Sequence, residues 1–466
     1  MTTAPTPDAV VVGSGPNGLA AAVTLAQHGL TVVVLEAHDE IGGGTRSAEL
    51  TVPGVRHDVC SAIHPLGVGS PYLRSLPLAD HGLVWRWPEV DLAHPLDDGT
   101  AAVLVRDLDE TARGLGADGR RWRSVFGPLA RSFDDVAPDV FGPVVHVPRR
   151  PVPLARFGLR AALPASVLAR AFRTDAARAL LAGCAAHICR PLDRPTTSAI
   201  GAALIAAGHR HGWPVAEGGS RAITDALAGL LRSLGGEIRT GVRVRSLDDL
   251  PDARVALFDT SPTGFADIAR RPRPRWRYGM AAHKLDLAVR GGVPWTAEAC
   301  RRAGTVHVGG TFEVIADAEA RVAGGELPER PFVLVGQQYL ADPSRSAGDV
   351  HPVWVYAHVP LGFAGDATSV VLEHVERYAP GLRERIVGQH VTDPVGFAAY
   401  NPNYVQGDIA SGMVSVPQLV RRAPYATGVP GVYLCSSSTA PGPGVHGMCG
   451  HRAALRALAD LDRVRS

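Results

Sequence analysis

Three glycines near the N-terminus constrain the fold more than any other feature of the sequence. They have the spacing G-x-G-x-x-G and lie at Gly13, Gly15 and Gly18. A run of buried-strand residues, Ala9–Val12, precedes them and good helix formers, Leu19–His28, follow them. A turn from a strand into a helix with this spacing binds a pyrophosphate through free backbone N–H groups and the helix dipole. The sequence therefore predicts a Rossmann-like α/β unit.

An acidic residue lies at the end of the second predicted strand of this unit. The second predicted strand, Thr31–Leu35, is rich in β-branched residues and ends in Glu36. A carboxylate at this place accepts hydrogen bonds from both ribose hydroxyls and disfavours a 2′-phosphate. We therefore expect a dinucleotide other than NADP.

A second glycine cluster distinguishes FAD from NAD. The segment IGGGTR, residues 41–46, holds three glycines and ends in an arginine. FAD is longer than NAD, and its pyrophosphate can use a second backbone nest together with a guanidinium. Because no residue is arranged for a covalent link, noncovalent FAD is the predicted cofactor. The residues predicted to bind it from these motifs are Gly13, Ser14, Gly15, Gly18, Glu36, Gly43, Gly44, Thr45 and Arg46.

A stretch of small residues near the C-terminus repeats this local pattern. Residues 435–454 read CSSSTAPGPGVHGMCGHRAA and contain no carboxylate. They follow a predicted strand, Gly431–Cys435, and lead into a helix that begins at Gly447. Backbone donors and a helix N-terminus suit the pyrimidine edge of a flavin, whose reduced form is negative. We predict that Ser437, Ser438, Gly447 and Met448 bind this end of FAD.

Together the motifs resemble the phytoene desaturase-related FAD-dependent oxidoreductases of the amine oxidase superfamily. The resemblance also rests on HDVCSAIHP (57–65) and NPNYVQGDIASG (401–412). It is greatest to the branch that contains pyridine nucleotide-disulfide oxidoreductase domain-containing protein 2, and weak over 71–200 and 262–390. It implies that the chain rejoins the nucleotide domain after residue 213, where Val244 presents its backbone to the adenine.

The chain is too long, at 466 residues, for one ordinary core. Alternating stretches, KLDLAV (284–289) and PVWVYAHV (352–359), predict antiparallel strands in the wall of a substrate chamber. The predicted fold is α/β: a Rossmann-like FAD-binding domain interleaved with a substrate domain of mixed sheet plus helices. The predicted segments are 1–70, 201–261 and 401–466 for the FAD-binding domain, and 71–200 and 262–400 for the substrate domain.

Other features limit the partners and the location. A net charge of +2 gives no reason to expect nucleic acid, and no apolar run is long enough to span a membrane. The start, MTTAPTPD, lacks the pattern of a signal peptide. The six cysteines show no metal-like pairing, so we expect no metal site and free thiols in a reducing cytoplasm. Cys184 and Cys189 are spaced as on one helix.

Segment 140–174 has two interpretations. It contains six arginines and no acidic residue. It can dock on the inner face of a membrane and admit a lipid-soluble substrate. Alternatively, its arginines lie on the solvated side of a helical domain. We favour the second interpretation because prolines interrupt any long amphipathic helix.

Three side chains are candidates for catalysis. Lys284 is the only lysine in the chain and lies in a strand that resembles one of the flavin amine oxidases, several of which hold a lysine–water pair at flavin N5. The alternative is that arginine has replaced the other lysines and that Lys284 remains by chance, without a catalytic role. His64 and His446 lie in predicted ring-facing loops and can act as bases near neutral pH. For both histidines we favour a structural role.

The predicted function is removal of a hydride and a proton across a C–C bond of an apolar substrate, such as a polyene or isoprenoid. The G-x-G-x-x-G spacing recurs at 114–119 and 442–447, but neither is followed by a second strand that ends in an acid, and no C-x-x-C redox pair lies near the flavin motifs. Reduced flavin would therefore pass electrons to oxygen, a quinone or a redox protein. Oxidation of a C–N bond in an amine is the first alternative. A cage of aromatic side chains facing the flavin ring would favour it, and an aromatic content of 6% does not suggest such a cage. A non-catalytic scaffold stabilised by FAD is the second, and the oligomeric state stays open.

Overall fold

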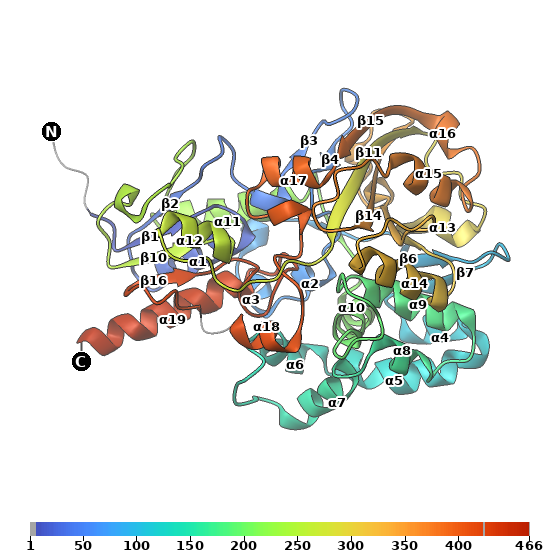
Figure 1. Cartoon of the computed structure of the whole chain (residues 1–466), viewed down its shortest axis with the longest axis horizontal. Helices are drawn as coiled ribbons and strands as arrows, with labels where there is room; N and C mark the ends of the chain where they lie inside the picture. Colours follow the sequence, from blue (N-terminus) through green and yellow to red (C-terminus); the bar gives the residue numbers. More distant parts are fainter. Residues whose placement is uncertain (1–5, 423–424, 466) are drawn as a thin grey trace.

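The computed structural model describes residues 6–422 and 425–465 and contains two large sheets (Figure 1). The first has the strand order β16-β10-β1-β2-β9, and all of its pairs are parallel. This confirms the predicted Rossmann-like unit, and three distant parts of the chain build it. The strands are β1 (Ala9–Val12), β2 (Val32–Leu35), β9 (Glu237–Arg239), β10 (Val255–Phe258) and β16 (Val432–Leu434).

Helix α1 (Pro16–Gln27) follows β1 and packs against α11 (Arg221–Ser233) and α19 (Met448–Arg465). It begins three residues before the predicted start because Pro16 is pre-organised for the first helical position. The first turns of α1 and α19 touch, since a Cβ built on Gly450 would lie 1.8 Å from the Asn17 carbonyl oxygen. Two helix N-termini therefore meet beside the first sheet.

The second sheet is mixed and has the order β15-β11-β14-β13-β12-β6-β7. The two predicted strands lie in it as antiparallel neighbours, with Lys284 opposite Tyr356. The fold class predicted from the sequence is thus confirmed, while the limits of its five segments stay predictions. The strands are β6 (Val90–Pro95), β7 (Ala101–Leu104), β11 (Ala281–Arg290), β12 (Ala303–Val308), β13 (Val333–Gly336), β14 (Val350–Val359) and β15 (Ile386–Thr392).

A layer of helices lies beside the mixed sheet, at the lower right of Figure 1. Within it α9 packs against α10 and against α14 (Phe312–Ala323). This layer and the mixed sheet together face the nucleotide domain. The helices are α4 (Leu108–Gly114), α5 (Gly119–Arg131), α6 (Phe133–Val140), α7 (Pro151–Ala161), α8 (Ala165–Ala169), α9 (Asp175–Ala186) and α10 (Ser198–His211).

Two local predictions are wrong. The strand predicted over Glu237–Leu247 ends at Arg239, because Gly241 has a φ of 71° and turns the chain toward Glu36. Cys184 and Cys189 do not share a helix, because α9 ends at Ala186. Cys189 lies in the following loop.

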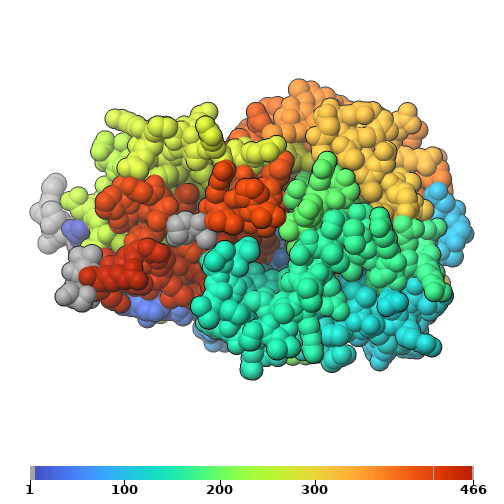
Figure 2. Space-filling model, turned by 60° about the horizontal axis from the view of Figure 1, so that its bottom comes forward, coloured from blue at the N-terminus to red at the C-terminus, as the bar shows by residue number. Residues whose placement is uncertain are grey.

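Part of segment 140–174 lies on the cyan-to-green surface in Figure 2, whereas Phe141, Ala165, Leu168, Ala169 and Phe172 are buried. No side chain of α7 is buried, and Val147 just before it is 90% exposed. In the part of the chain that the structure describes, no helix combines the length and apolar character needed to cross a membrane. Peripheral membrane contact through this segment stays a prediction.

Candidate functional site

One cavity of about 720 Å³ extends from the carboxyl edge of the parallel sheet to the mixed sheet and the helical layer. Its nucleotide end is lined by the first glycine turn, by Glu36 and by residues 242–245, which include Val244. The second glycine cluster and the C-terminal stretch line its middle. Ligands of open parallel sheets bind at this edge.

The first glycine turn has the geometry that its spacing predicts. Gly13 has a φ of 100°, which a side chain rarely adopts. A Cβ on Gly18 would lie 2.1 Å from the Gly13 carbonyl oxygen, so helix and strand approach more closely than alanine allows. Gly13, Ser14 and Gly15 line the cavity. Gly18 lies behind them.

Glu36 is the centre of a hydrogen-bond network at the nucleotide end. Its Oε2 accepts from the Ser14 backbone N–H at 2.9 Å and from the Ser14 hydroxyl at 2.6 Å. Its Oε1 accepts from the His38 backbone N–H at 2.9 Å and lies 3.5 Å from Arg46 Nη2. A buried carboxylate of this kind fits the hydroxyls of a ribose, which can replace the Ser14 contacts.

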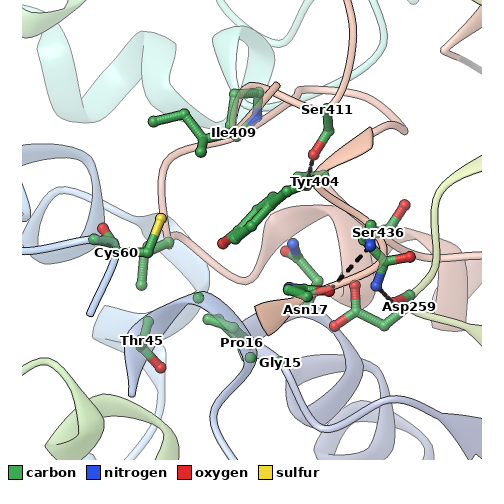
Figure 3. Close-up of a pocket in the computed structure, with 18 of the residues that line it drawn as sticks. Gly15, Pro16, Asn17, Thr45, Cys60, Asp259, Tyr404, Ile409, Ser411 and Ser436 are labelled. Atoms are coloured by element: carbon green, nitrogen blue, oxygen red, sulfur yellow. Dashed lines mark hydrogen bonds between the residues drawn. The ribbon is translucent and has the colours of Figure 1, made fainter. Parts of the chain in front are cut away.

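The second glycine cluster lies directly beside the first glycine turn, since a Cβ on Gly43 would lie 3.0 Å from the Gly15 Cα. Gly43, Gly44, Thr45 and Arg46 all line the cavity. A Cβ on Gly44 would lie 2.1 Å from Tyr404 Oη, so only glycine leaves room beside this ring. Figure 3 shows Tyr404 pointing into the cavity between Cys60 and Asn17.

The C-terminal stretch contributes part of its residues. Ser436, Ser437 and Gly444 line the cavity. The other residues predicted to bind the flavin end are not among its lining residues. They are Ser438, Gly447 and Met448, the last of which begins α19.

Asp259 is a site residue that the sequence analysis missed. It follows β10 at the carboxyl edge of the sheet, and its Oδ2 accepts from the Gly18 backbone N–H at 2.9 Å. A Cβ on Gly15 would lie 2.6 Å from the same oxygen. Burial raises the pKa of Asp259 to about 7, and the charge on Glu36 adds to the shift. Its place directly after a buried strand was the available signal.

The three candidate catalytic residues do not line the cavity. Lys284 is buried in β11, and its ammonium donates to Asp286, whose other carboxylate oxygen lies 3.5 Å from His57 Nδ1. His64 Nε2 lies 2.8 Å from the Ser220 hydroxyl, and burial lowers the pKa of His64 to about 4. Catalytic roles for Lys284 and His64 stay predictions.

His446 is also buried. Its Nδ1 accepts from the Met448 backbone N–H at 3.1 Å, and burial lowers its pKa to about 4. It is therefore neutral at physiological pH and fixed by the backbone at the start of α19. Its catalytic role stays a prediction as well.

The far end of the cavity is mostly apolar. It lies against β12, β13 and β14, helix α10 and the loop after α9. Among the described residues that line this end, none is a carboxylate. They are Ile63, Leu66, His187, Cys189, Ile200, Leu204, Trp213, Thr305, Leu334, Trp354 and Tyr356.

Comparisons with known proteins agree with this architecture. A model of NAD(P)-binding Rossmann-like domains matches residues 11–76. Pyridine nucleotide-disulfide oxidoreductase domain-containing protein 2 of Rattus norvegicus is 24% identical, over 98% of this chain and 94% of the relative. One component of the limonene dehydrogenase of Castellaniella defragrans is 30% identical over 141 residues, which are 29% of this chain and 25% of the relative.

Among solved structures, putrescine oxidase bound to putrescine superposes with a TM-score of 0.63 and 19% identity, covering 98% of this chain and 99% of that one. This likeness shows the fold alone. The predicted resemblance and fold class are thereby confirmed. The chain has the fold of putrescine oxidase, and its N-terminal part matches a Rossmann-like domain.

Proposed function

We propose that the chain is an FAD-dependent oxidoreductase that takes a hydride and a proton from an apolar substrate. The observation that carries this proposal is the single cavity that joins a dinucleotide cradle to an apolar chamber. A cofactor in the cradle and a substrate in the chamber would meet without crossing solvent. FAD supplies a hydride acceptor when bound.

The residues present fit FAD. Two glycine clusters approach the middle of the cavity, and the Gly15 and Gly44 positions leave no room for side chains. In the described structure the buried Asn17 Oδ1 and Thr260 Oγ1 have no hydrogen-bond partner, and both residues line the cavity. NAD would leave the C-terminal part of this cradle empty. The chain's own role is to bind, orient and exclude water.

An apolar substrate that loses hydrogen across a C–C bond fits the far end best. That end offers no carboxylate to an ammonium group in the described residues, and the limonene dehydrogenase relative acts on an isoprenoid by its name. Amine oxidation is the second candidate. Trp213, Trp354 and Tyr356 support it, because aromatic faces favour cations.

The substrate class is tested by anaerobic mixing of FAD-loaded protein with limonene, a longer polyene, putrescine and cyclohexylamine. We expect an apolar hydrocarbon to bleach the visible flavin band and the amines to leave it unchanged. NADH and NADPH should bleach it slowly or not at all, because FAD fills the dinucleotide-binding unit that contains Gly13, Gly15 and Gly18. Photoreduction provides the control that the flavin can be reduced. Bleaching by amines alone would favour C–N oxidation, and photoreduction without bleaching by any compound would favour the scaffold.

Asp259 should make FAD binding depend on pH. The pyrophosphate is anionic, and the Asp259 carboxyl is neutral below its pKa of about 7 and negative above it. FAD affinity should therefore fall as the pH rises above 7, by at most about tenfold per pH unit. Asp259→Asn should abolish this dependence while keeping an acceptor for the Gly18 N–H.

This dependence is measured by titrating FAD-free protein with FAD between about pH 6 and 9. Asp267→Asn is the matched control, because Asp267 also lines the cavity but is exposed and paired with Arg273. Equal pH dependence in the parent and in Asp259→Asn would place Asp259 away from the pyrophosphate.

A further inference from the structure

A cysteine, a histidine and a glutamate form a hydrogen-bonded chain at the substrate end of the cavity. Cys189 Sγ lies 3.5 Å from His358 Nε2, and His358 Nδ1 lies 2.8 Å from Glu319 Oε1. The three residues come from the loop after α9, from β14 and from α14. Tertiary packing alone brings them together.

Only one end of this chain reaches the cavity. His358 is 2% exposed and Glu319 is fully buried, whereas Cys189 lines the chamber. Glu319 Oε2 has no hydrogen-bond partner in the described structure, so this carboxylate forms its hydrogen bond through Oε1, to His358. A ligand in the chamber would therefore meet the sulfur first.

The electrostatics favour a charged pair. Burial lowers the pKa of His358, but Cys189 and Glu319 outweigh it and hold that pKa well above 6.5. A thiol beside a protonated histidine ionises readily. A protonated His358 can donate from Nδ1 to Glu319 and from Nε2 to the Cys189 sulfur, so one imidazolium contacts both groups.

The other titratable groups around His358 keep one charge state near neutral pH. Burial lowers the pKa of His187 to about 3 and that of His307 well below 6.5. Burial also raises the pKa of Tyr356 well above 10. None of the three changes its charge between about pH 6 and 9.

The backbone at Cys189 is strained. Its φ of 53° lies in the left-handed region, which a residue with a side chain adopts only at a cost in free energy. Such strain concentrates at functional sites. Here it directs the sulfur between His358 and the chamber.

We propose that Cys189 and His358 form a thiolate–imidazolium pair, oriented by Glu319, that is the base of the substrate chamber. Its role toward substrate rests on the proposed function. One substrate carbon would lose a proton to Sγ, which becomes a thiol, and FAD, when bound, would supply the acceptor for the hydride that leaves the neighbouring carbon. The electron pair of the C–H bond that loses the proton would form the second bond of the C=C, and the hydride would leave with the electron pair of its own C–H bond. The thiol then returns its proton to solvent after the product leaves.

The pair is tested by alkylation of FAD-loaded protein with iodoacetamide, followed by peptide mass spectrometry. We expect a rate at Cys189 that changes little between about pH 6 and 8.5, because the thiolate is already formed. His358→Gln should slow the reaction about 100-fold or more at pH 6, since an ordinary thiol ionises near pH 8.5. Glu319→Gln should slow it less. Cys184 is the internal control, because it is buried away from the cavity and should not react.

The pH profile of the parent protein alone can overturn the proposal, whether or not the variants fold. A rate that rises about tenfold per pH unit up to pH 8.5 would show a neutral thiol. Repeating the reaction after release of FAD shows whether the cofactor covers the sulfur, and an unreactive thiol in both forms would also overturn the pair. Fast alkylation in a protein that binds no FAD would refute the proposed function and leave the pair standing.

The role as base is tested with a substrate that bleaches the flavin. Cys189→Ser should lower kcat by about 10²- to 10⁴-fold and shift the pH profile, with photoreduction unchanged. Full activity with the parent pH profile would show that the pair is not the base.

Discussion

Replacing Glu36 with arginine is expected to weaken FAD binding by about 30- to 150-fold, a loss of ~2–3 kcal/mol. Glu36 is buried, and its carboxylate would exchange the Ser14 contacts for ribose hydroxyls when the cofactor binds. The variant loses these charge-assisted hydrogen bonds and brings a second guanidinium next to Arg46 in a closed space.

The affinity is measured by titrating FAD-free protein with FAD and following the quenching of flavin fluorescence. Glu40→Arg is the matched control, because it reverses the same charge nearby, at an exposed side chain paired with Arg221. Equal affinities of the Glu36 variant and the parent would remove Glu36 from the ribose.

The second large effect concerns stability. Lys284→Met should destabilise the fold by about 3–5 kcal/mol, because it leaves the Asp286 carboxylate buried without its cation. Burial already raises the pKa of Asp286 in the presence of Lys284, which shows how costly a charge is there. The double variant Lys284→Met, Asp286→Leu should recover most of the loss, since a well-packed apolar pair can replace a buried ion pair.

Urea unfolding of the FAD-free parent, the single variant and the double variant separates these cases. Working without FAD keeps any change in cofactor binding out of the comparison. A single variant that unfolds at the same urea concentration as the parent would show that Lys284 does not compensate Asp286.

The dinucleotide end was predictable because its chemistry is local. Gly13, Gly15 and Gly18 follow one another within a single turn, and Glu36 ends the very next strand. Backbone geometry at such a turn depends on few distant contacts. The ion pair between Lys284 and Asp286 could also have been predicted from the sequence, because residues two apart on a strand share a face.

The substrate end was not predictable in the same way. More than a hundred residues separate Cys189 from Glu319, and strand β13 lies between Glu319 and His358. Only the packing of α9, α14 and β14 brings the three side chains together. Because one helix was predicted through Cys184 and Cys189, the loop that places Cys189 at the chamber was missed. A low overall content of aromatic residues also gave no sign that Trp354 and Tyr356 would gather at one wall.

The most direct test of the account is the cofactor that the protein binds. FAD-free protein dialysed against a mixture of FAD, FMN, NAD and NADP should retain one FAD per chain and none of the others. Acid precipitation should then release the flavin into solution, as expected for noncovalent binding. Retention of NAD or NADP without FAD, or of no dinucleotide, would contradict the account, and flavin that stays with the polypeptide would contradict the noncovalent part.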